Sequence, residues 1–354
     1  MSELRTLSES PAGLSPANSD AIATARGSSV RKTLLGPRSG NIWLGAVLVA
    51  LILVFGLSGT GFLSQASWVA TSSYAVIILI LALGQTFVVI SGGIDLSQGS
   101  VLGFSAMGGA AVMRAITESG ASAAMSISTG IVVTLALGAG VGLINGLLVT
   151  KAHITPFIAT LATLSAFQGG IAIINGGTAI FELPPEVGLI GGLALFAGWL
   201  PILALVAILA AVVCALLLNF TRFGLRTFAV GSNREAALRT GVKVDRHLIK
   251  VYVLSGLLGG LAGVCYVMRF SSVSPTAGQG IELTAIAAVV IGGASLMGGR
   301  GSLLGTVLGA AIISVIVTGL ITMNVPTFWQ LVAVGAILAG AAYVDYVRTR
   351  VAKR

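Results

Sequence analysis

The chain has 354 residues, of which 56% are hydrophobic and only 9% are charged, and its formal net charge is +9. Soluble domains carry roughly 25% charged residues, so this composition excludes an ordinary soluble protein. It predicts an all-α, polytopic transmembrane helical bundle. The basic residues fall in short loops and at the termini, which favours a topological signal at a bilayer over binding of nucleic acid.

Residues 1–40 contain no apolar stretch long enough for the core of a signal peptide. We expect a disordered cytoplasmic tail there, a membrane domain over residues 41–347, and a short basic cytoplasmic tail over residues 348–354. About 20 apolar residues cross a bilayer. Such runs predict ten spans, of which the eighth is short and rich in glycine: 42–62, 68–90, 99–116, 124–150, 154–175, 199–219, 248–270, 283–299, 302–323 and 328–347.

Ten spans place both termini and the loop 220–247 in the cytoplasm. All but two of the 20 Lys and Arg then lie in or beside cytoplasmic segments, where positive residues are retained. The two exceptions, Arg114 and Arg269, are predicted to lie on the outer face.

The glycine-rich junction at residues 90–103, ISGGIDLSQGSVLG, resembles the one at residues 291–305, IGGASLMGGRGSLLG. At an offset of 200, the pair Gly92 and Gly93 aligns with Gly292 and Gly293, which suggests an internal duplication. Glycine pairs inside apolar segments predict broken or re-entrant helices. We interpret Asp95 as a cap for the following half-helix, with a proton carrier or a ligand contact as the alternatives.

Glycines also recur every four residues inside two spans, at Gly138, Gly142, Gly146, Gly256 and Gly260. Small residues let helix backbones approach each other in lipid, so we expect tight packing within the bundle rather than a specific dimer face. Cys214 and Cys265 lie in spans and are interpreted as small core side chains.

The loop 220–247 and the adjoining end of the next span carry seven basic residues: Arg222, Arg226, Arg234, Arg239, Lys243, Arg246 and Lys250. Ser232 and Glu235 have the spacing of a capping box, and Gly241 stands where a left-handed residue would end a helix. We therefore expect one short, rigid helix that serves as a cytoplasmic docking feature.

Four motifs follow one another along the chain: GGIDLSQGSVLG, NGLLVTKAHITPFIATLATLSAFQGG, TRFGLRTFAVGSNREAALRTGV and PTAGQGIELTAIAAVVIGGASLMGGRGSLLGTVLGA. Over residues 42–347 the chain thereby resembles the permease subunits of ribose-type bacterial ABC sugar importers. The resemblance implies a bacterial inner-membrane protein that forms its pathway with a second permease copy. It further implies a cytoplasmic ATP-binding cassette protein as the motor and a periplasmic or lipid-anchored sugar-binding protein as the source of substrate.

The sequence has no G-x-x-x-x-G-K-[ST] phosphate loop. We therefore expect no enzymatic activity and no cofactor in this chain, with ATP and Mg held by the partner. By the resemblance, residues 234–240 form the helix that couples to the ATPase. Ala236 and Ala237 would fit a groove on that partner, and Glu235 would cap the helix and pair with the partner. The coupling residues are then Ser232, Arg234, Glu235, Ala236, Ala237, Arg239 and Gly241.

On the outer face, Arg114, Arg269 and Glu282 are candidates for docking the binding protein, with contact to lipid headgroups as the alternative for the arginines. The segment 271–282 is a candidate for the receptor-facing surface or outer gate. In the span 154–175, polar and aromatic side chains are predicted to line the pathway, the alternative being hydrogen bonds between helices. They are Thr160, Thr163, Phe167, Gln168 and Asn175.

Two other function classes compete with an ATP-driven importer of a ribose-like monosaccharide or similar small polyol. A transporter or channel that works alone usually needs ionisable groups within the membrane, and only Asp95 and Glu282 qualify. An intramembrane enzyme would need a carboxylate pair or a metal constellation. His153 and His247, at the ends of cytoplasmic loops, do not form one.

Overall fold

The computed structural model describes the backbone of residues 37–59 and 61–352, and the side chains of residues 41–59 and 61–343. The predicted N-terminal tail lies outside the described residues except for its last four, and so do the side chains of the predicted C-terminal tail. The chain divides into two units, Met1–Trp43 and Leu44–Arg354. Every contact described below lies within the second.

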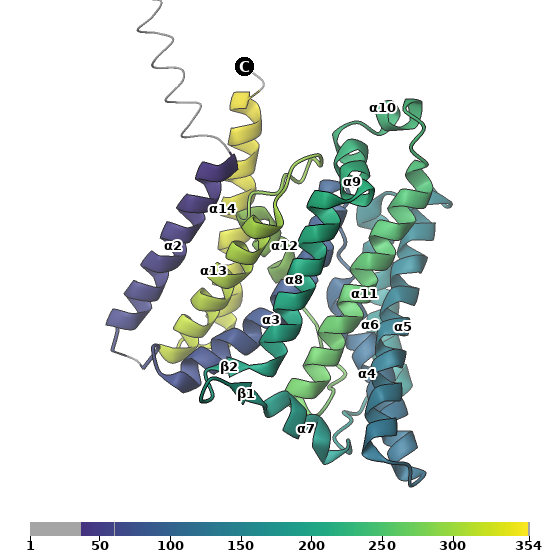
Figure 1. The fold of residues 1–354 in the computed structure, drawn as a ribbon, viewed down its shortest axis with the longest axis vertical. Helices are drawn as coiled ribbons and strands as arrows, with labels where there is room; N and C mark the ends of the chain where they lie inside the picture. The colour runs from purple at the N-terminus through teal and green to yellow at the C-terminus, as the bar shows by residue number, and fades with distance from the viewer. Residues whose placement is uncertain (1–36, 60, 353–354) are drawn as a thin grey trace, which may run out of the picture. The chain divides into compact units, whose positions relative to one another are not determined.

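The predicted all-α architecture is confirmed for the described residues (Figure 1). The helices are α2 (Pro37–Leu57), α3 (Gln65–Ile90), α4 (Gln98–Glu118), α5 (Ala123–Thr150), α6 (Pro156–Ile174), α7 (Pro185–Gly192), α8 (Ile202–Phe220), α9 (Arg222–Ser232), α10 (Arg234–Arg239), α11 (Val244–Phe270), α12 (Ile281–Ile291), α13 (Leu303–Thr322) and α14 (Thr327–Ala352). Two short strands, β1 (Ala194–Leu195) and β2 (Leu200–Pro201), pair antiparallel, with Ala194 opposite Pro201.

Each of the ten predicted spans corresponds to one helix. Seven of the described helices are long and apolar enough to cross a membrane, and three apolar helical stretches are shorter: Asn41–Leu57, Ile281–Ile291 and Thr327–Tyr343. The predicted span 283–299 is wrong at its C-terminal end, because α12 stops at Ile291 and a loop follows. Helix α14 continues to Ala352, beyond the predicted end at residue 347.

Helix α3 forms the centre of the bundle. Its most apolar window is 83% buried, whereas the corresponding windows of α6 and α8 are only 22% buried. Two hydroxyl groups on α3 are satisfied within the helix, since Thr71 and Thr86 each donate to the carbonyl four residues earlier. Thr86 also bonds to Thr306 of α13 at 2.7 Å. The outer faces of α6 and of α8, which pack against different helices, are thus each left open to lipid or to another chain.

Helices α5 and α11 pack against each other through their glycines, so the predicted tight packing within the bundle is confirmed. A Cβ atom on Gly138 would lie 2.7 Å from the backbone nitrogen of Gly260, and one on Gly146 would lie 2.9 Å from the Cα of Ile249. Real Cβ atoms essentially never approach so closely. The two helix backbones are therefore in direct contact. The regularly spaced glycines allow this packing within the chain.

Helices α3 and α12 end in the same way. The N–H groups of Ser91, Gly92 and Gly93 donate to the carbonyls of residues 87, 89 and 88, and those of residues 292–294 donate to residues 288, 290 and 289. Each end carries one left-handed glycine, Gly92 with φ +86° and Gly293 with φ +84°, as in a Schellman motif. Gly92 therefore matches Gly293, and the predicted alignment of Gly92 with Gly292 is wrong by one residue.

We expect Gly138→Leu to destabilise the protein by about 1–3 kcal/mol or more, because the side chain would overlap the α11 backbone. Gly140→Leu is the matched control, since nothing lies within 4 Å of a Cβ atom at that position. Thermal unfolding of the purified protein in detergent measures both. An equal loss in the two variants would contradict the close approach of α5 and α11.

Candidate functional site

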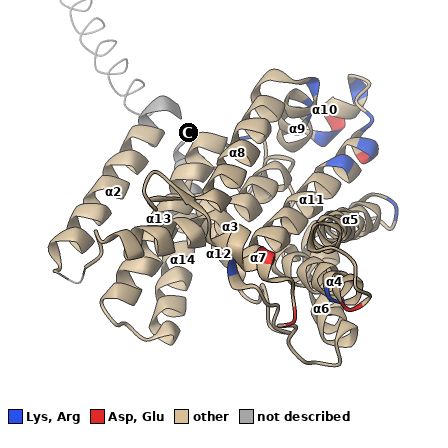
Figure 2. Ribbon diagram, turned by 60° about the horizontal axis from the view of Figure 1, so that its bottom comes forward, with Lys and Arg blue, Asp and Glu red and all other residues tan. Residues whose placement is uncertain are grey.

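The basic loop folds into two helices, α9 and α10, rather than the single helix that was predicted. Lys and Arg gather around these helices and the start of α11 (Figure 2). The predicted capping box is wrong: Ser232 is the last residue of α9, and Asn233 caps α10, its Oδ1 accepting the N–H of Ala236 at 2.9 Å. Asn233 is the residue with the extended backbone that an N-cap needs. Gly241 follows α10 with φ +81°, so its predicted left-handed conformation is confirmed.

Helix α10 presents a different face from the one predicted. Ala237 is only 4% exposed and packs with Val230, Val244 and Leu248, so its predicted role in a partner-facing surface is wrong. Ala237 lies on the face of α10 that packs against α9 and α11. The outward residues are Arg234, Glu235, Ala236, Leu238 and Arg239.

Leu238 is the residue of α10 that the sequence reasoning missed. It is 52% exposed, although it is the largest apolar side chain of the helix. The available signal in the sequence was a large apolar side chain next to Arg239 in a basic loop. Arg234 is fixed beside it by an ion pair with Asp245 of α11, at 3.1 Å.

The C-terminal end of α9, which leads into α10, packs backbone against backbone with both helix breaks. The N–H of Gly299, in the loop after α12, donates to the carbonyl of Ile90 at 2.8 Å. A Cβ atom on Gly231 of α9 would overlap that carbonyl and lie 2.7 Å from the Gly299 nitrogen, while one on Gly298 would lie 2.9 Å from the Cα of Gly92. We call these five residues the glycine junction. Gly231, Gly298 and Gly299 were not singled out from the sequence.

A cavity of about 440 Å³ opens beside the glycine junction. It is lined by the end of α3, the loop between α5 and α6, the end of α9 and the start of α10, and residues of α11. Arg234 lies on its wall, and so does Tyr252, whose buried hydroxyl has no hydrogen-bond partner among the described residues. The surface next to α10 is therefore concave.

Asp95 is 2% exposed and lies between α3 and α4. Its Oδ1 accepts the N–H and the hydroxyl of Ser97, at 3.0 and 2.6 Å, and its Oδ2 accepts the hydroxyl of Ser255 on α11 at 2.9 Å. The N–H bond is the kind of contact expected of a residue that caps the start of α4. With its amide turned to face the Asp95 backbone, Gln85 of α3 pairs with the N–H and C=O of Asp95 at 3.2 and 3.0 Å.

Two chains of hydrogen bonds from other helices end at this carboxylate. Thr163 of α6 donates to Asn145 of α5, and Asn145 donates to Ser97, both at 2.7 Å. Gln98 donates to Ser255 from the other side. Every donor points toward Asp95, as an ionised carboxylate requires because it can only accept. The Asp95 network consists of Asp95, Ser97, Gln98, Asn145, Thr163 and Ser255.

The predicted pathway residues of α6 all contact neighbouring segments of the same chain. Thr160 accepts the N–H of Leu96 at 3.1 Å, and Thr163 belongs to the Asp95 network. Phe167 packs against Phe104 of α4, with ring centroids 4.8 Å apart, and Gln168 donates to the carbonyl of Pro275 at 3.2 Å. These are contacts of the interhelical kind that the sequence left as the alternative. The open face of α6 is instead formed by residues such as Phe157, Ile158, Leu161 and Ile173.

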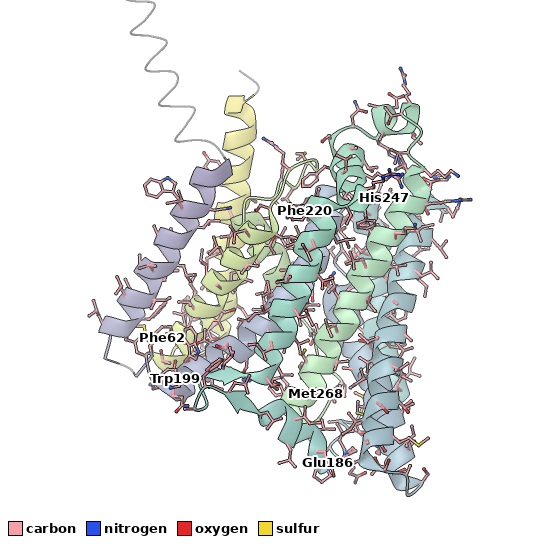
Figure 3. All side chains as sticks on the ribbon, in the orientation of Figure 1. Phe62, Glu186, Trp199, Phe220, His247 and Met268 are labelled. Carbon is pink, nitrogen blue, oxygen red and sulfur yellow. The ribbon has the colours of Figure 1, made fainter. Side chains whose placement is uncertain are left out.

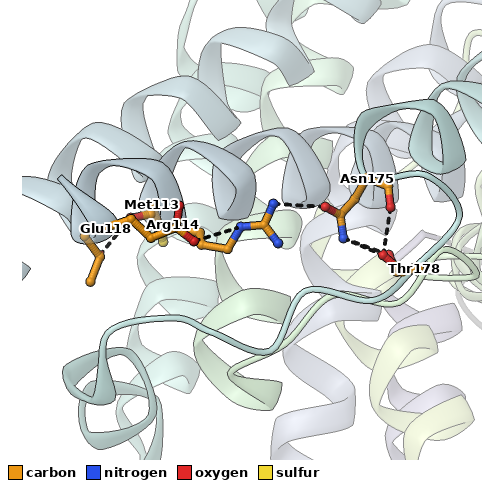
Figure 4. Close-up of polar contacts among 6 residues, drawn as sticks. Met113, Arg114, Glu118, Asn175 and Thr178 are labelled. Atoms are coloured by element: carbon orange, nitrogen blue, oxygen red, sulfur yellow. Dashed lines mark hydrogen bonds and ion pairs between the residues drawn. The ribbon is translucent and has the colours of Figure 1, made fainter.

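At the opposite end of the bundle, the candidate docking residues also have neighbours. Arg114 donates to Asn175 at 3.0 Å and lies 3.7 Å from Glu118 (Figure 4). Asn175 follows the last residue of α6, so it does not lie along the helix with the other predicted pathway residues. Arg269 lies over the ring of Phe270, 5.4 Å from its centroid. Glu282 is half-buried at the start of α12, where a Cβ atom on Gly99 would overlap its carboxylate.

Among the described residues, no group of three or more His, Cys, Asp or Glu side chains is placed to hold a metal ion. Cys214 and Cys265 are buried in the apolar core, as the sequence predicts.

The chain matches the protein-family model described as "Branched-chain amino acid transport system / permease component" over residues 67–342. It is 40% identical over 299 residues to the ribose import permease protein RbsC of Bacillus subtilis (strain 168), covering 84% of this chain and 90% of that one. The RbsC protein of Escherichia coli (strain K12) is 36% identical over 274 residues, covering 75% and 81%.

The autoinducer 2 import system permease protein LsrC of Yersinia enterocolitica is 32% identical over 308 residues, covering 85% of this chain and 82% of that one. No solved structure matches. The matched residues 67–342 contain the Asp95 network, the glycine junction and α10. The chain is therefore a multi-pass membrane permease and belongs to this family of transport-system permease components.

Proposed function

We propose that this chain is the membrane subunit of an ATP-driven, binding-protein-dependent importer for a ribose-like monosaccharide or similar small polyol. Three relatives with import-permease names, two of them for ribose, support the class of solute. The observation that carries the proposal is the position of α10, an exposed short helix that directly follows α9, whose end packs against both helix breaks at the glycine junction. A helix held in this way can transmit force from a partner into the bundle.

The partner at α10 is a cytoplasmic ATPase, which holds the ATP and Mg. The exposed Leu238 supplies an apolar contact, Arg234, Glu235 and Arg239 supply charges around it, and the adjoining cavity supplies a concave surface. An apolar anchor within a polar rim is the usual anatomy of a protein interface. In this proposal α10 and both termini lie in the cytoplasm of a bacterial cell, which agrees with the positive-inside rule.

A second permease copy completes the pathway in this proposal. The open faces of α6 and α8 support it, because they leave room for another chain as well as for lipid. We propose α6 as a pathway helix, with its half-buried Phe167 and Gln168 near the solute. A periplasmic or lipid-anchored sugar-binding protein docks at the opposite end, near Arg114, Arg269 and the segment 271–282.

We expect Leu238→Asp to abolish co-purification with the ATPase or to weaken it by roughly tenfold or more, because a charge would replace the central apolar contact. Leu189→Asp is the matched control, since Leu189 is also exposed but lies on α7, at the end of the bundle opposite α10 (Figure 1). Affinity capture of the ATPase measures both variants. Normal capture by the Leu238 variant would contradict docking at α10.

Gly231→Ala should uncouple the importer without releasing the ATPase. The added methyl group would overlap the Ile90 carbonyl and force the glycine junction apart, while the outward face of α10 stays unchanged. Gly241→Asn is the control, because nothing lies within 4 Å of that Cβ position and Asn tolerates a left-handed backbone. The ratio of solute transported to ATP hydrolysed in proteoliposomes should fall for the Gly231 variant only.

Asp95→Asn separates the ATP-driven importer from a proton-coupled carrier. We expect transport to persist and the stability to fall by about 1–3 kcal/mol, because an amide N–H would face the donors Ser97 or Ser255. Transport should require ATP and should survive a protonophore. Uptake that collapses with the proton gradient and disappears in Asp95→Asn without loss of stability would favour the carrier.

A further inference from the structure

Residues 193–201 form a hairpin between α7 and α8, which we call the opposite hairpin because it lies at the end of the bundle away from α10. Large apolar side chains on it are unusually exposed: Leu193 is 56% exposed, Phe196 75% and Trp199 46%. Figure 3 places Trp199 at the same end as Phe62 and Glu186, and His247 at the other end. A cluster of exposed apolar side chains marks an interaction surface.

The turn of this hairpin is strained. Phe196, Ala197 and Gly198 follow one another with φ of +51°, +56° and +92°, and a left-handed backbone is rare for a residue as bulky as Phe. The turn is held by Gln65 of α3, which donates to the carbonyl of Ala197 at 2.7 Å. The left-handed backbone directs the side chain of Phe196 away from the bundle, where it is largely exposed and packs little against the rest of the chain. Burial against something outside the chain would offset that strain.

The chemistry around the hairpin identifies what covers it. Residues 187–221 contain no Asp, Glu, Lys or Arg, whereas the rim of a protein interface is polar. The hairpin continues directly into α8, whose exposed face carries Leu205, Leu209 and Leu216. Apolar surface therefore runs without interruption from the turn onto a membrane helix. Trp and other aromatic residues concentrate where lipid headgroups meet acyl chains.

We propose that the opposite hairpin is a lipid anchor, with Phe196 and Trp199 at the boundary between headgroups and acyl chains in the leaflet away from α10. This role is independent of the transported solute and of the ATPase. The hairpin is connected to the end of α11 through α7, because Gly188 and Gly191 of α7 pack against Ser271 and Met268. The anchor thus fixes the depth at which α11 ends and the segment 271–280 begins.

The test uses the full-length chain with Trp199 as its only tryptophan, Trp43, Trp68 and Trp329 being replaced by Phe. The protein is reconstituted in phosphatidylcholine vesicles that contain lipids brominated either near the headgroup or near the end of the acyl chain. We expect headgroup-proximal bromine to quench Trp199 about twofold more than chain-end bromine, and aqueous iodide to quench it weakly. Strong quenching by iodide without quenching by lipid would overturn the proposal, because the hairpin would then face water.

Protection of Trp199 from both quenchers would also overturn it, since another protein surface would then cover the hairpin. Two variants in the same background test the contribution of Phe196. Phe196→Leu keeps an apolar side chain and should preserve the lipid quenching. Phe196→Asp should lift the turn toward water and raise the quenching by iodide about twofold. Equal behaviour of the two variants would show that Phe196 is not part of the anchor.

Discussion

A carboxylate inside an apolar bundle must find hydrogen-bond donors on both oxygens, and much of the interior polarity of this permease follows from that need. A charged group at the centre of a bilayer costs roughly 2.5–3.5 kcal/mol on insertion scales. Asp95 offsets such a cost with donors that lead, directly or through one or two further groups, to α4, α5, α6 and α11. The hydroxyls of Ser97 and Ser255, which donate to Asp95, accept hydrogen bonds from Asn145 and Gln98. Hydrogen bonds therefore run in one direction through the network, and they fix how these helices pack. Glycines in α5 and α11 then allow the close approach that brings Asn145 to Ser97 and Ser255 to Asp95.

A second constraint acts at the glycine junction, where three segments meet without side chains between them. Gly231 has space for no Cβ atom, and Gly299 donates directly to Ile90. Backbone contacts of this kind tolerate little relative movement, unlike contacts between flexible side chains. The short helix α10 is therefore built onto the bundle as a rigid extension. Its outward face remains available for a partner, and its inward Ala237 completes a small apolar cluster.

The sequence was informative where one local property decides the structure. Apolar run length located a helix for each of the ten predicted spans, and glycine spacing indicated tight packing within the bundle. It failed where two residues compete for one role: Asn233 rather than Ser232 caps α10. It also failed at the end of α12, because hydropathy cannot tell a helix from a glycine-rich apolar loop. The position of Asp95 suggested a cap, but Ser255 lies 160 residues away. Only the packing of distant helices brings such partners together.

The predicted internal repeat has a structural counterpart in the matching ends of α3 and α12, which meet at the same place in the fold. Each helix stops at a left-handed glycine, and the segments that follow them touch the same residue of α9. In the proposed importer, a force applied at that residue would act on the segments after α3 and α12 at the same time. One movement of the docking helix would then reach both halves of the predicted repeat together.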